Sequence, residues 1–550
     1  MTNKRNRQSR RNARLPTGRS IPQTGAQILR KIVNTGYSES GASFKKGTMA
    51  GWCPTRSSPQ SDIDMNLPTL RARSADAVMS IPLASSAINT SRTHVIGAGL
   101  KLSPKPKYKL LGITPEQAKE WARITKEEFD LWANSEFCDL LKKNNWYDMQ
   151  DIAYQCCMID GDSFAAFKYR EPLPGMPYML RVQLFEASRV CNPGSMGLNS
   201  PWTVTIKNPD NGNRIINGVE VDDDGAIVAY WICNRYPYDP TNMQIPQWVR
   251  VEVFGKTTGQ LNILQICHDE RPETYRGVPY LAPVLEVLKQ VGRYTEAELT
   301  AAIIKSFFSL FFEESYANNG NFFPLQDAFN RQDRVSLDPN AFELGSGTMN
   351  VLPPGYKVTT VDTSRSLSTY EAFSNQLIRQ IGATLEQPYE VLLKSFNSSY
   401  SASRAALLQA WAAFKIRRIW FVRDFCQPSY EVWLTEAVAI GRVKAPGFFT
   451  DPIKRKAWAN AEWYGPVMGS VDPVKEVNAA ALRVKYGFST REKETAEMTG
   501  TNFDENVESL AIEEQTLRDA GLAGGMEVDA SSDKDLLEQE QQQQKGGHWI

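Results

Sequence analysis

Residues 284–315 read VLEVLKQVGRYTEAELTAAIIKSFFSLFFEES, the longest stretch of this chain that could form one regular element. The stretch contains no proline, and Gly292 is its single glycine. Polar side chains recur every three or four residues, which leaves the broad apolar face that is typical of a helix. That face consists of Leu285, Leu288, Val291, Leu299, Ile303 and Phe307. About thirty helical residues span roughly 45–50 Å, and a helix of that length usually connects distant parts of an assembly.

The segments after this helix predict a small β unit followed by two more helices. Residues 316–360 are rich in Asn, Gly and Pro. We expect strands at 348–352 and 356–361, a helix at 368–384, a polar flexible stretch at 394–403 and a third helix from about 404 to 425.

The first half of the chain predicts helices and then strands. Residues 68–98 have helical spacing that is interrupted at Pro82. A helix is predicted at 114–132, where Thr114 can cap and Pro115 can occupy the first turn. From about 178 to 266 the pattern favours strands, with turns at 208–213 and 222–225.

Length and composition describe a globular protein of several domains. The chain has 550 residues, and roughly 150 residues per domain predicts about 3 to 4 units. Lys plus Arg and Asp plus Glu are both 62, so the net charge is zero. This balance argues against tight electrostatic binding of nucleic acid over the whole surface. The eight cysteines have no paired spacing, which favours reduced thiols, and no apolar run is long enough to predict a membrane span.

The two ends of the chain carry opposite charges. The first 38 residues hold nine Lys or Arg and no acid, and Pro and Gly interrupt them where a signal peptide would be apolar. We therefore expect a mobile basic arm at 1–60. Residues 500–540 hold twelve acids against Arg518 and Lys534, and glutamines follow. An acidic, disordered tail is predicted at 526–550.

Possible catalytic motifs are incomplete. Gly255-Lys256-Thr257-Thr258 resembles part of a phosphate-binding loop, but Arg250 stands where the first glycine is required. Gly161-Asp162-Ser163-Phe164 resembles the serine block of some esterases, but none of the three histidines has the Asp three residues earlier that such enzymes use. A turn is the better interpretation of that block.

Possible metal motifs are also isolated. Cys267-His268-Asp269 has no partner pair with metal-ligand spacing, so a buried or edge position is expected. The acidic triplet at 222–224 is better interpreted as a hairpin turn than as a metal site. The sequence therefore predicts no enzyme activity, no metal and no cofactor.

Eight segments, in order along the chain, carry a resemblance to a known family. They lie at 71–100, at 217–220 with 224–225 and 229–230, at 276–284, 293–299, 352–355 and 386–390, at 400–406 up to Trp411, and at 471–476 up to Arg491. Through them the chain, over roughly residues 65 to 525, resembles the lambda-type portal proteins of tailed bacteriophages.

The resemblance implies an α+β protomer that assembles into a ring, usually a dodecamer, at one capsid vertex of the virion. Double-stranded DNA passes through the ring without sequence specificity during packaging and ejection. The implied partners are the terminase large subunit, the major capsid protein or scaffold, and head-completion or neck proteins. Assembly would take place in the host cytoplasm, with no membrane involved. A cytosolic enzyme with a dispersed site and a non-phage assembly scaffold are the alternatives.

The resemblance also implies an assignment of regions. It places a wing at 61–283, a stem helix at 284–315, a clip at 316–362, a returning stem helix at 366–385, a tunnel loop at 386–402, a helix towards the crown at 403–425 and a helical crown at 426–525. The tunnel-loop residues that could face DNA are Lys394, Phe396, Asn397, Ser398, Ser399 and Tyr400. The apolar face of the long helix would then contact neighbouring copies.

Overall fold

The structure is a computed structural model that describes residues 47–49, 51–194, 204–237, 239, 241–307, 311–314, 356–359, 367–396, 399–469 and 473–522. The chain divides into two compact units, Met1–Ser58 and Pro59–Ile550. In the first unit only 47–49 and 51–58 are described. Of the basic arm predicted at 1–60, residues 1–46 and 50 therefore lie outside the described residues, and the predicted tail at 526–550 lies wholly outside them.

Local sequence signals determine the helices that begin the second unit. After a π-helical turn (Gln60–Asp64) come α2 (Leu67–Ser80), α3 (Pro82–Val95), α4 (Tyr108–Leu111), α5 (Pro115–Ala133) and α6 (Trp146–Asp160). Pro82 and Pro115 lie in first turns, where the missing N–H costs no hydrogen bond. The Thr114 hydroxyl accepts a hydrogen bond from the Gln117 N–H, and the Gln117 side chain accepts one from the Thr114 N–H. The predicted break at Pro82 and the helix at 114–132 are confirmed.

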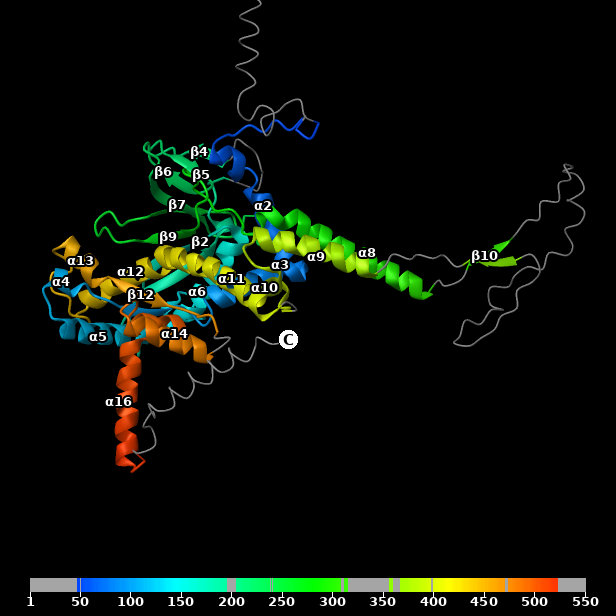
Figure 1. Ribbon diagram of the computed structural model, residues 1–550. Coiled ribbons are helices and arrows are strands. Elements are labelled where there is room, and N and C mark those ends of the chain that lie inside the picture. The colour runs from blue at the N-terminus through cyan, green and yellow to red at the C-terminus, as the bar shows by residue number, and fades with distance from the viewer. Residues whose placement is uncertain are drawn as a thin grey trace, which may run out of the picture. The chain divides into compact units, whose positions relative to one another are not determined.

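The strands predicted between 178 and 266 form antiparallel sheets (Figure 1). A three-stranded sheet has the order β3-β2-β9, with β2 at Asp162–Tyr169, β3 at Leu180–Glu186 and β9 at Ile263–Cys267. A five-stranded sheet has the order β4-β5-β6-β7-β8 and contains Thr205–Lys207, Arg214–Ile216, Val219–Val221, Ile227–Cys233 and Trp248–Glu252. The segments 208–213 and 222–225 are turns in this sheet, so the acidic triplet is a hairpin turn, as predicted.

Strand β2 separates two cores because its successive side chains point to opposite faces. Phe164 and Ala166 pack against the five-stranded sheet in a cluster that includes Val219 and Tyr230. Ala165 and Phe167 face the other way, into the larger core that the helices form. The three-stranded sheet is therefore the middle layer between the helices and the five-stranded sheet.

The larger core joins segments that are far apart in the sequence. Helix α12 (Gln427–Ala439) buries Trp433, whose ring lies 5.1 Å from that of Phe129 in α5 in an edge-to-face contact. The short helix α13 (Pro452–Trp458) follows, and β12 (Ala461–Tyr464) pairs antiparallel with β1 (Lys101–Pro104). The predicted crown segment, 426–525, thus begins inside a core that it shares with the predicted wing.

The third predicted helix is longer than expected and continuous with α12. Helix α11 (Tyr400–Phe421) begins four residues before the predicted start and passes through a π-helical turn (Val422–Cys426) into α12. The Gln427 N–H donates to the Val422 carbonyl, five residues earlier. Because Pro428 has no N–H and its ring would collide with the preceding turn, the helix widens at this point instead of ending.

The long helix is shorter than the sequence predicted. Helix α8 is Leu285–Phe307 and follows a single 3-10 turn at Ala282–Val284. Phe311–Glu314 form β10, which pairs antiparallel with β11 (Tyr356–Thr359), so the prediction of helix is wrong over those residues. Aromatic side chains such as Phe311 and Phe312 favour strands, and a partner strand satisfies the backbone groups of both segments. The predicted strand at 356–361 is confirmed, and the one at 348–352 lies outside the described residues.

The helix predicted at 368–384 is confirmed, whereas the loop predicted at 386–402 is partly wrong. Helix α9 is Leu367–Thr384. Inside the predicted loop at 386–402 lies the short helix α10 (Tyr389–Leu393), and α11 has already begun at Tyr400. Val391 and Leu392 of α10 are buried in the larger core, which explains why this part is ordered as helix. Between α10 and α11 the described residues are 394–396 and 399, and they belong to neither helix nor strand.

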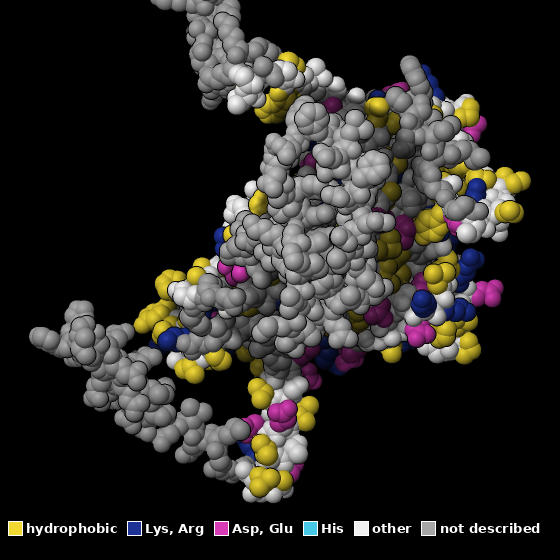
Figure 2. Space-filling view, turned by 90° about the vertical axis from the view of Figure 1, so that its right-hand side faces the viewer, with side chains coloured by type: hydrophobic (Ala, Val, Ile, Leu, Met, Phe, Trp, Pro, Cys, Tyr) yellow, Lys and Arg dark blue, Asp and Glu magenta, His cyan; other side chains and the backbone are white. Residues whose placement is uncertain are grey.

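Three further helices follow β12: α14 (Pro473–Lys485), α15 (Arg491–Thr499) and α16 (Phe503–Asp519). Helix α16 buries no side chain, and Figure 2 shows hydrophobic and acidic side chains along it. Its first turn is attached to α5 by the ion pairs Lys119–Asp504 and Lys126–Glu505, at 2.9 and 2.6 Å. Among the helices of the described ranges, none has the length and apolar character needed to cross a bilayer.

Candidate functional site: the α8–α9 pair and its buried root

Helices α8 and α9 lie side by side and run in opposite directions (Figure 1). The Tyr294 ring of α8 lies 5.4 Å from the Tyr370 ring and 5.3 Å from the Phe373 ring of α9. The hydroxyls of Thr295 and Tyr370 are 3.0 Å apart. Aromatic contacts of this kind stabilise a helix pair beyond the area that they bury.

The pair is anchored in the body of the chain at one end, which we call the root. Leu288 and Ile381 are buried there. The Tyr280 hydroxyl donates to the Leu385 carbonyl, and Gln387 Nε2 donates to the Ala87 carbonyl of α3 at 2.9 Å. Arg417 of α11 lies over the Tyr280 ring, 4.5 Å from its centroid. The root therefore holds both helices of the pair against α3 and α11.

The structure divides the predicted apolar face of α8 into two parts. Leu288 is fully buried at the root, and Leu285 and Val291 pack against the same core. Farther along, Leu299 is 61% exposed and Ile303 47% exposed, while the side chain of Phe307 lies outside the described part. On α9, Phe373 is 50% exposed. The outer part of the pair thus carries apolar side chains that are about half exposed or more.

The predicted DNA-facing residues belong to the short connection between α10 and α11. Lys394 ends α10 in the left-handed conformation, with φ of 55°. Phe396 is 48% exposed, and Ser399 is also exposed. Asn397 and Ser398 lie outside the described residues, as does the side chain of Tyr400, the first residue of α11.

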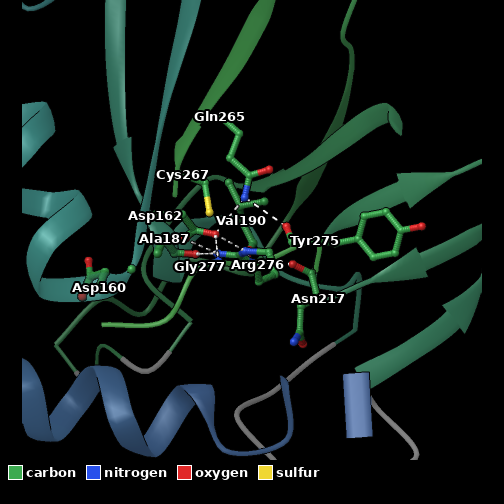
Figure 3. A network of polar contacts seen from close by, with 12 residues as sticks. Asp160, Asp162, Ala187, Val190, Asn217, Gln265, Cys267, Tyr275, Arg276 and Gly277 are labelled. Carbon is green, nitrogen blue, oxygen red and sulfur yellow. Dashed lines mark hydrogen bonds and ion pairs between the residues drawn. The ribbon is translucent and has the colours of Figure 1, made fainter. Parts of the chain in front are cut away.

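A buried ionic network lies between α2, the two sheets and the segment that leads into α8, and sequence reasoning did not find it (Figure 3). Asp162, the first residue of β2, accepts hydrogen bonds from Arg276 Nε at 2.6 Å and Nη2 at 3.1 Å. Arg71 Nη2 of α2 donates to the same carboxylate at 3.0 Å. Gln265 Nε2 and the Gly277 N–H complete its set of donors, at 2.9 and 3.1 Å.

Arg276 distributes its remaining N–H groups among backbone carbonyls. Its Nη2 donates to Ala187 at 2.8 Å, and its Nη1 donates to Val190 at 2.7 Å and to Asn217 in the turn between β5 and β6. A buried charge is tolerated when it is paired and its hydrogen bonds are satisfied, and Arg276 meets both conditions. One side chain thus connects the three-stranded sheet, the five-stranded sheet and the approach to α8.

Two glycines allow this network to form. Gly161 ends α6 with φ of 93°, and a Cβ there would lie 2.3 Å from the Gly277 carbonyl oxygen. A Cβ on Gly277 would lie 2.0 Å from the Gly161 carbonyl oxygen. The two backbones therefore touch, and only glycine fits at either position. The motif at 161–164, considered above for an esterase, and the Arg276-Gly277 motif form one structural unit.

Burial raises and the neighbouring arginines lower the pKa of three carboxyl groups, and the balance differs among them. Burial would raise the pKa of Asp162, but Arg276 and Arg71 outweigh it and hold that pKa below its usual value. Burial raises the pKa of Asp64, in the π-helical turn, to about 7 against the opposing effect of Arg276 and Arg71. It also raises the pKa of Asp160 to about 7. Neither oxygen of Asp64 has a hydrogen-bond partner among the described residues.

The other motifs considered in the sequence lie in or next to strands of the three-stranded sheet. The prediction of a turn at 161–164 is wrong from Asp162 onwards, because these residues begin strand β2, where neighbouring strands satisfy their backbone groups. Ser163 is buried in that strand and donates to the Ala153 carbonyl at 3.0 Å. Cys267 ends β9, and burial raises its pKa well above the ordinary value. Within the described ranges, no group of three or more His, Cys, Asp or Glu could hold a metal ion.

Comparison with known proteins now identifies the class. The family model described as phage portal protein, lambda family, matches residues 45–418. The portal protein of Escherichia phage N15 is 25% identical over 512 residues, which are 88% of this chain and 91% of that protein. Portal protein B of Escherichia phage lambda is 24% identical, over 88% of this chain and 91% of that one. A chain in the virion of a native gene transfer agent particle is 12% identical, covering 78% of this chain and 92% of its own, with a TM-score of 0.39.

The chain belongs to the lambda family of phage portal proteins. Its α+β class agrees with the sequence-based prediction.

Replacing Asp162 with Asn should destabilise the protein strongly. The change leaves Arg276 and Arg71 buried without their counter-charge, which costs about 3–5 kcal/mol. Asp504→Asn serves as the control, because it breaks an exposed ion pair worth about 1 kcal/mol or less. Urea unfolding measures the loss of folding free energy in each variant. Equal, small effects would show that the network does not hold the fold together.

Replacing Asp64 with Asn should change how stability depends on pH. Because the pKa of Asp64 is raised to about 7, its protonated form is favoured in the folded state, and stability is lost as pH rises from about 4 to above 7. Asn cannot ionise, so the variant should match the wild type near pH 4 and exceed its stability near pH 8, by up to about 4 kcal/mol. Thermal or urea unfolding at several pH values tests this, and parallel curves for the two proteins would contradict it.

Proposed function

We propose that this chain assembles with further copies of itself into the ring-shaped portal at one capsid vertex, through which double-stranded DNA enters and later leaves. Family membership supports the role, and the exposed apolar part of α8 carries the proposal for assembly. Leu299 and Ile303 lie on an anchored helix, where water contact is unfavourable and a neighbouring copy can cover them. Each copy offers one surface to the next, which is the arrangement that closes a ring.

The regions can be assigned on this basis. Residues 61–283 form the wing, and α8 and α9 form the stem. The clip comprises 316–362, which contains β11, together with the partner strand β10 at Phe311–Glu314. The connection at 394–399 is the tunnel loop, and residues 426–525 contribute the crown, although their first part shares the core of the wing. The ring is a dodecamer in this proposal.

The partners follow from the same role. The terminase large subunit would dock during packaging, head-completion or neck proteins would replace it, and the capsid protein or scaffold would surround the wing. The portal is assembled in the host cytoplasm and remains in the virion. In this role the protein needs no cofactor and catalyses no reaction.

The tunnel loop is proposed to touch DNA without gripping it. Lys394 supplies one positive charge, which can pair briefly with a phosphate, and the exposed Phe396 provides bulk. Each phosphate that a protein neutralises adds salt-dependent affinity. A single lysine per copy therefore limits the friction on moving DNA.

Charged residues on the outer part of α8 should prevent ring assembly. In Leu299→Asp/Ile303→Asp, two carboxylates face the surface that a neighbouring copy would cover, and burying them without partners is costly. We expect folded monomers with an unchanged melting temperature, because both positions are exposed within the chain. Native mass spectrometry measures assembly. Met243→Asp, at a 95% exposed position after β7, is the control and should assemble normally. Rings of normal size from the double variant would contradict the proposal.

Changing the tunnel loop should impair DNA packaging but not assembly. Lys394→Asn removes the charge and suits the left-handed conformation, and Phe396→Ser removes the exposed ring. We expect normal rings and a lower yield of packaged or retained DNA in particles, measured as nuclease-protected DNA. Lys444→Asn, at an exposed position after α12, should package normally. If the double variant also packages normally, these residues have no role at the DNA.

A further inference from the structure

A cavity of about 540 Å³ lies beside the ends of β2 and β3, at the opposite end of β2 from Asp162. The side chains that determine its character are Lys142, Tyr169, Arg170, Glu171 and Arg181. Three of them are cations and one is an acid. The cavity therefore has an excess of positive charge.

Arg181 of β3 is the unusual member of this lining, because it is only 2% exposed. Its Nη1 donates to the carbonyls of Tyr178 and Leu180, both at 2.8 Å. Its Nη2 is buried and has no hydrogen-bond partner among the described residues. Backbone carbonyls fix Nη1, and Nη2 is the nitrogen of this cavity-lining guanidinium that lacks an acceptor.

The charge of Arg181 has no direct counter-ion in the described chain. Glu436 acts on it electrostatically, but the two Glu436 oxygens accept from the backbone N–H groups of Met179 and Leu180, at 2.5 and 3.0 Å. Burial lowers the pKa of Arg181. An unpaired buried charge is unfavourable, so an anion in the cavity would be bound favourably.

The rim adds two exposed cations. Lys142 and Arg170 are exposed and form no ion pair with any residue of the described ranges. The loop that carries Lys142 is fixed by Asp139, whose carboxylate accepts from the backbone N–H groups of Leu141, Lys143 and Asn144. Lys142 is thereby held at the cavity in the left-handed conformation, with φ of 56°.

Another cavity, of about 580 Å³, lies between α11, β12 and α15. It differs from the cavity at Arg181 in its charge balance and in the partners of its arginine. Three acids balance its three bases. Its arginine, Arg418, donates to the carbonyls of His94, Val95 and Pro466 and so has partners for its N–H groups. Excess positive charge and an unsatisfied buried donor therefore distinguish the cavity at Arg181.

We propose that the cavity at Arg181 binds a phosphate group. A guanidinium and a second cation are suited to the oxygens of a phosphate, and a lining of three cations and one acid matches a doubly charged anion. The volume leaves room for a substituent, so the group can belong to free phosphate, to a phosphate ester or to a nucleic acid. The site lies within a single chain and does not depend on ring assembly.

Titration calorimetry of the full-length protein with inorganic phosphate, at constant ionic strength in chloride, tests this site. We expect saturable binding of one phosphate per chain. In Lys142→Ala/Arg170→Ala, both exposed residues are removed without disturbing the core, and the Kd should rise about tenfold or more. Lys143→Ala changes the neighbouring exposed lysine and should leave the Kd unchanged. Arg181→Met should abolish phosphate binding if the variant folds. If it does not fold, Lys142→Ala/Arg170→Ala still tests the site, because both of those residues are exposed.

The outcomes separate the sources of the phosphate. If a short DNA duplex competes with phosphate in the wild type and not in Lys142→Ala/Arg170→Ala, the site takes nucleic-acid phosphate. If the duplex does not compete, the site takes free phosphate or a small ester, and either result upholds the proposal. No saturable binding to the wild type, or an equal Kd in the double variant, overturns it.

Discussion

The structure depends on one buried carboxylate. Asp162 lies where α6 ends and β2 begins, and it binds Arg276 from the segment that leads to α8 as well as Arg71 from α2. Through Arg276 it also reaches the backbone of both sheets. Because an ion pair of this kind is favourable only when every donor and acceptor is satisfied, it requires the correct placement of all these segments together. The direction in which α8 leaves the body follows from that requirement.

Sequence patterns predicted the elements better than the contacts between them. Pro82, Thr114 and the turn at 222–225 act through neighbouring residues, so their effects could be predicted locally. The strand at 311–314 could not, because its aromatic run fits helix or strand until β11 supplies a partner. The polar stretch from 394 onwards predicts a loop at 386–402, whereas Val391 and Leu392 belong to a core that distant segments complete. The Asp162 network depends on contacts of the same kind, although its signals are visible in the sequence: an acid two residues before Phe164-Ala165-Ala166-Phe167 and the pair Arg276-Gly277.

Two buried arginines show how the same side chain can serve different purposes. Arg276 has a bidentate carboxylate partner and three carbonyl acceptors, and it consolidates the fold. Arg181 has two carbonyl acceptors, no bound carboxylate and one unsatisfied nitrogen. Desolvation affects both, but only Arg276 is compensated within the described chain. A buried charge without a compensating partner, such as that of Arg181, is typical of residues that meet a ligand.

The first turns of α8 and the last turns of α9 are anchored together at the root, and this has a mechanical consequence. Three residues, 386–388, lie between Leu385 at the root and α10, and Lys394 directly follows that helix. Glu386, with φ of 56°, forms the bend between them, and its carboxylate is paired with Arg417 at 2.9 Å. The root is thus the place where the pair is held, and it connects to Lys394 through the bend at Glu386 and the short helix α10. A load on the exposed part of the pair, near Leu299 and Phe373, would therefore act on the bend that leads to α10.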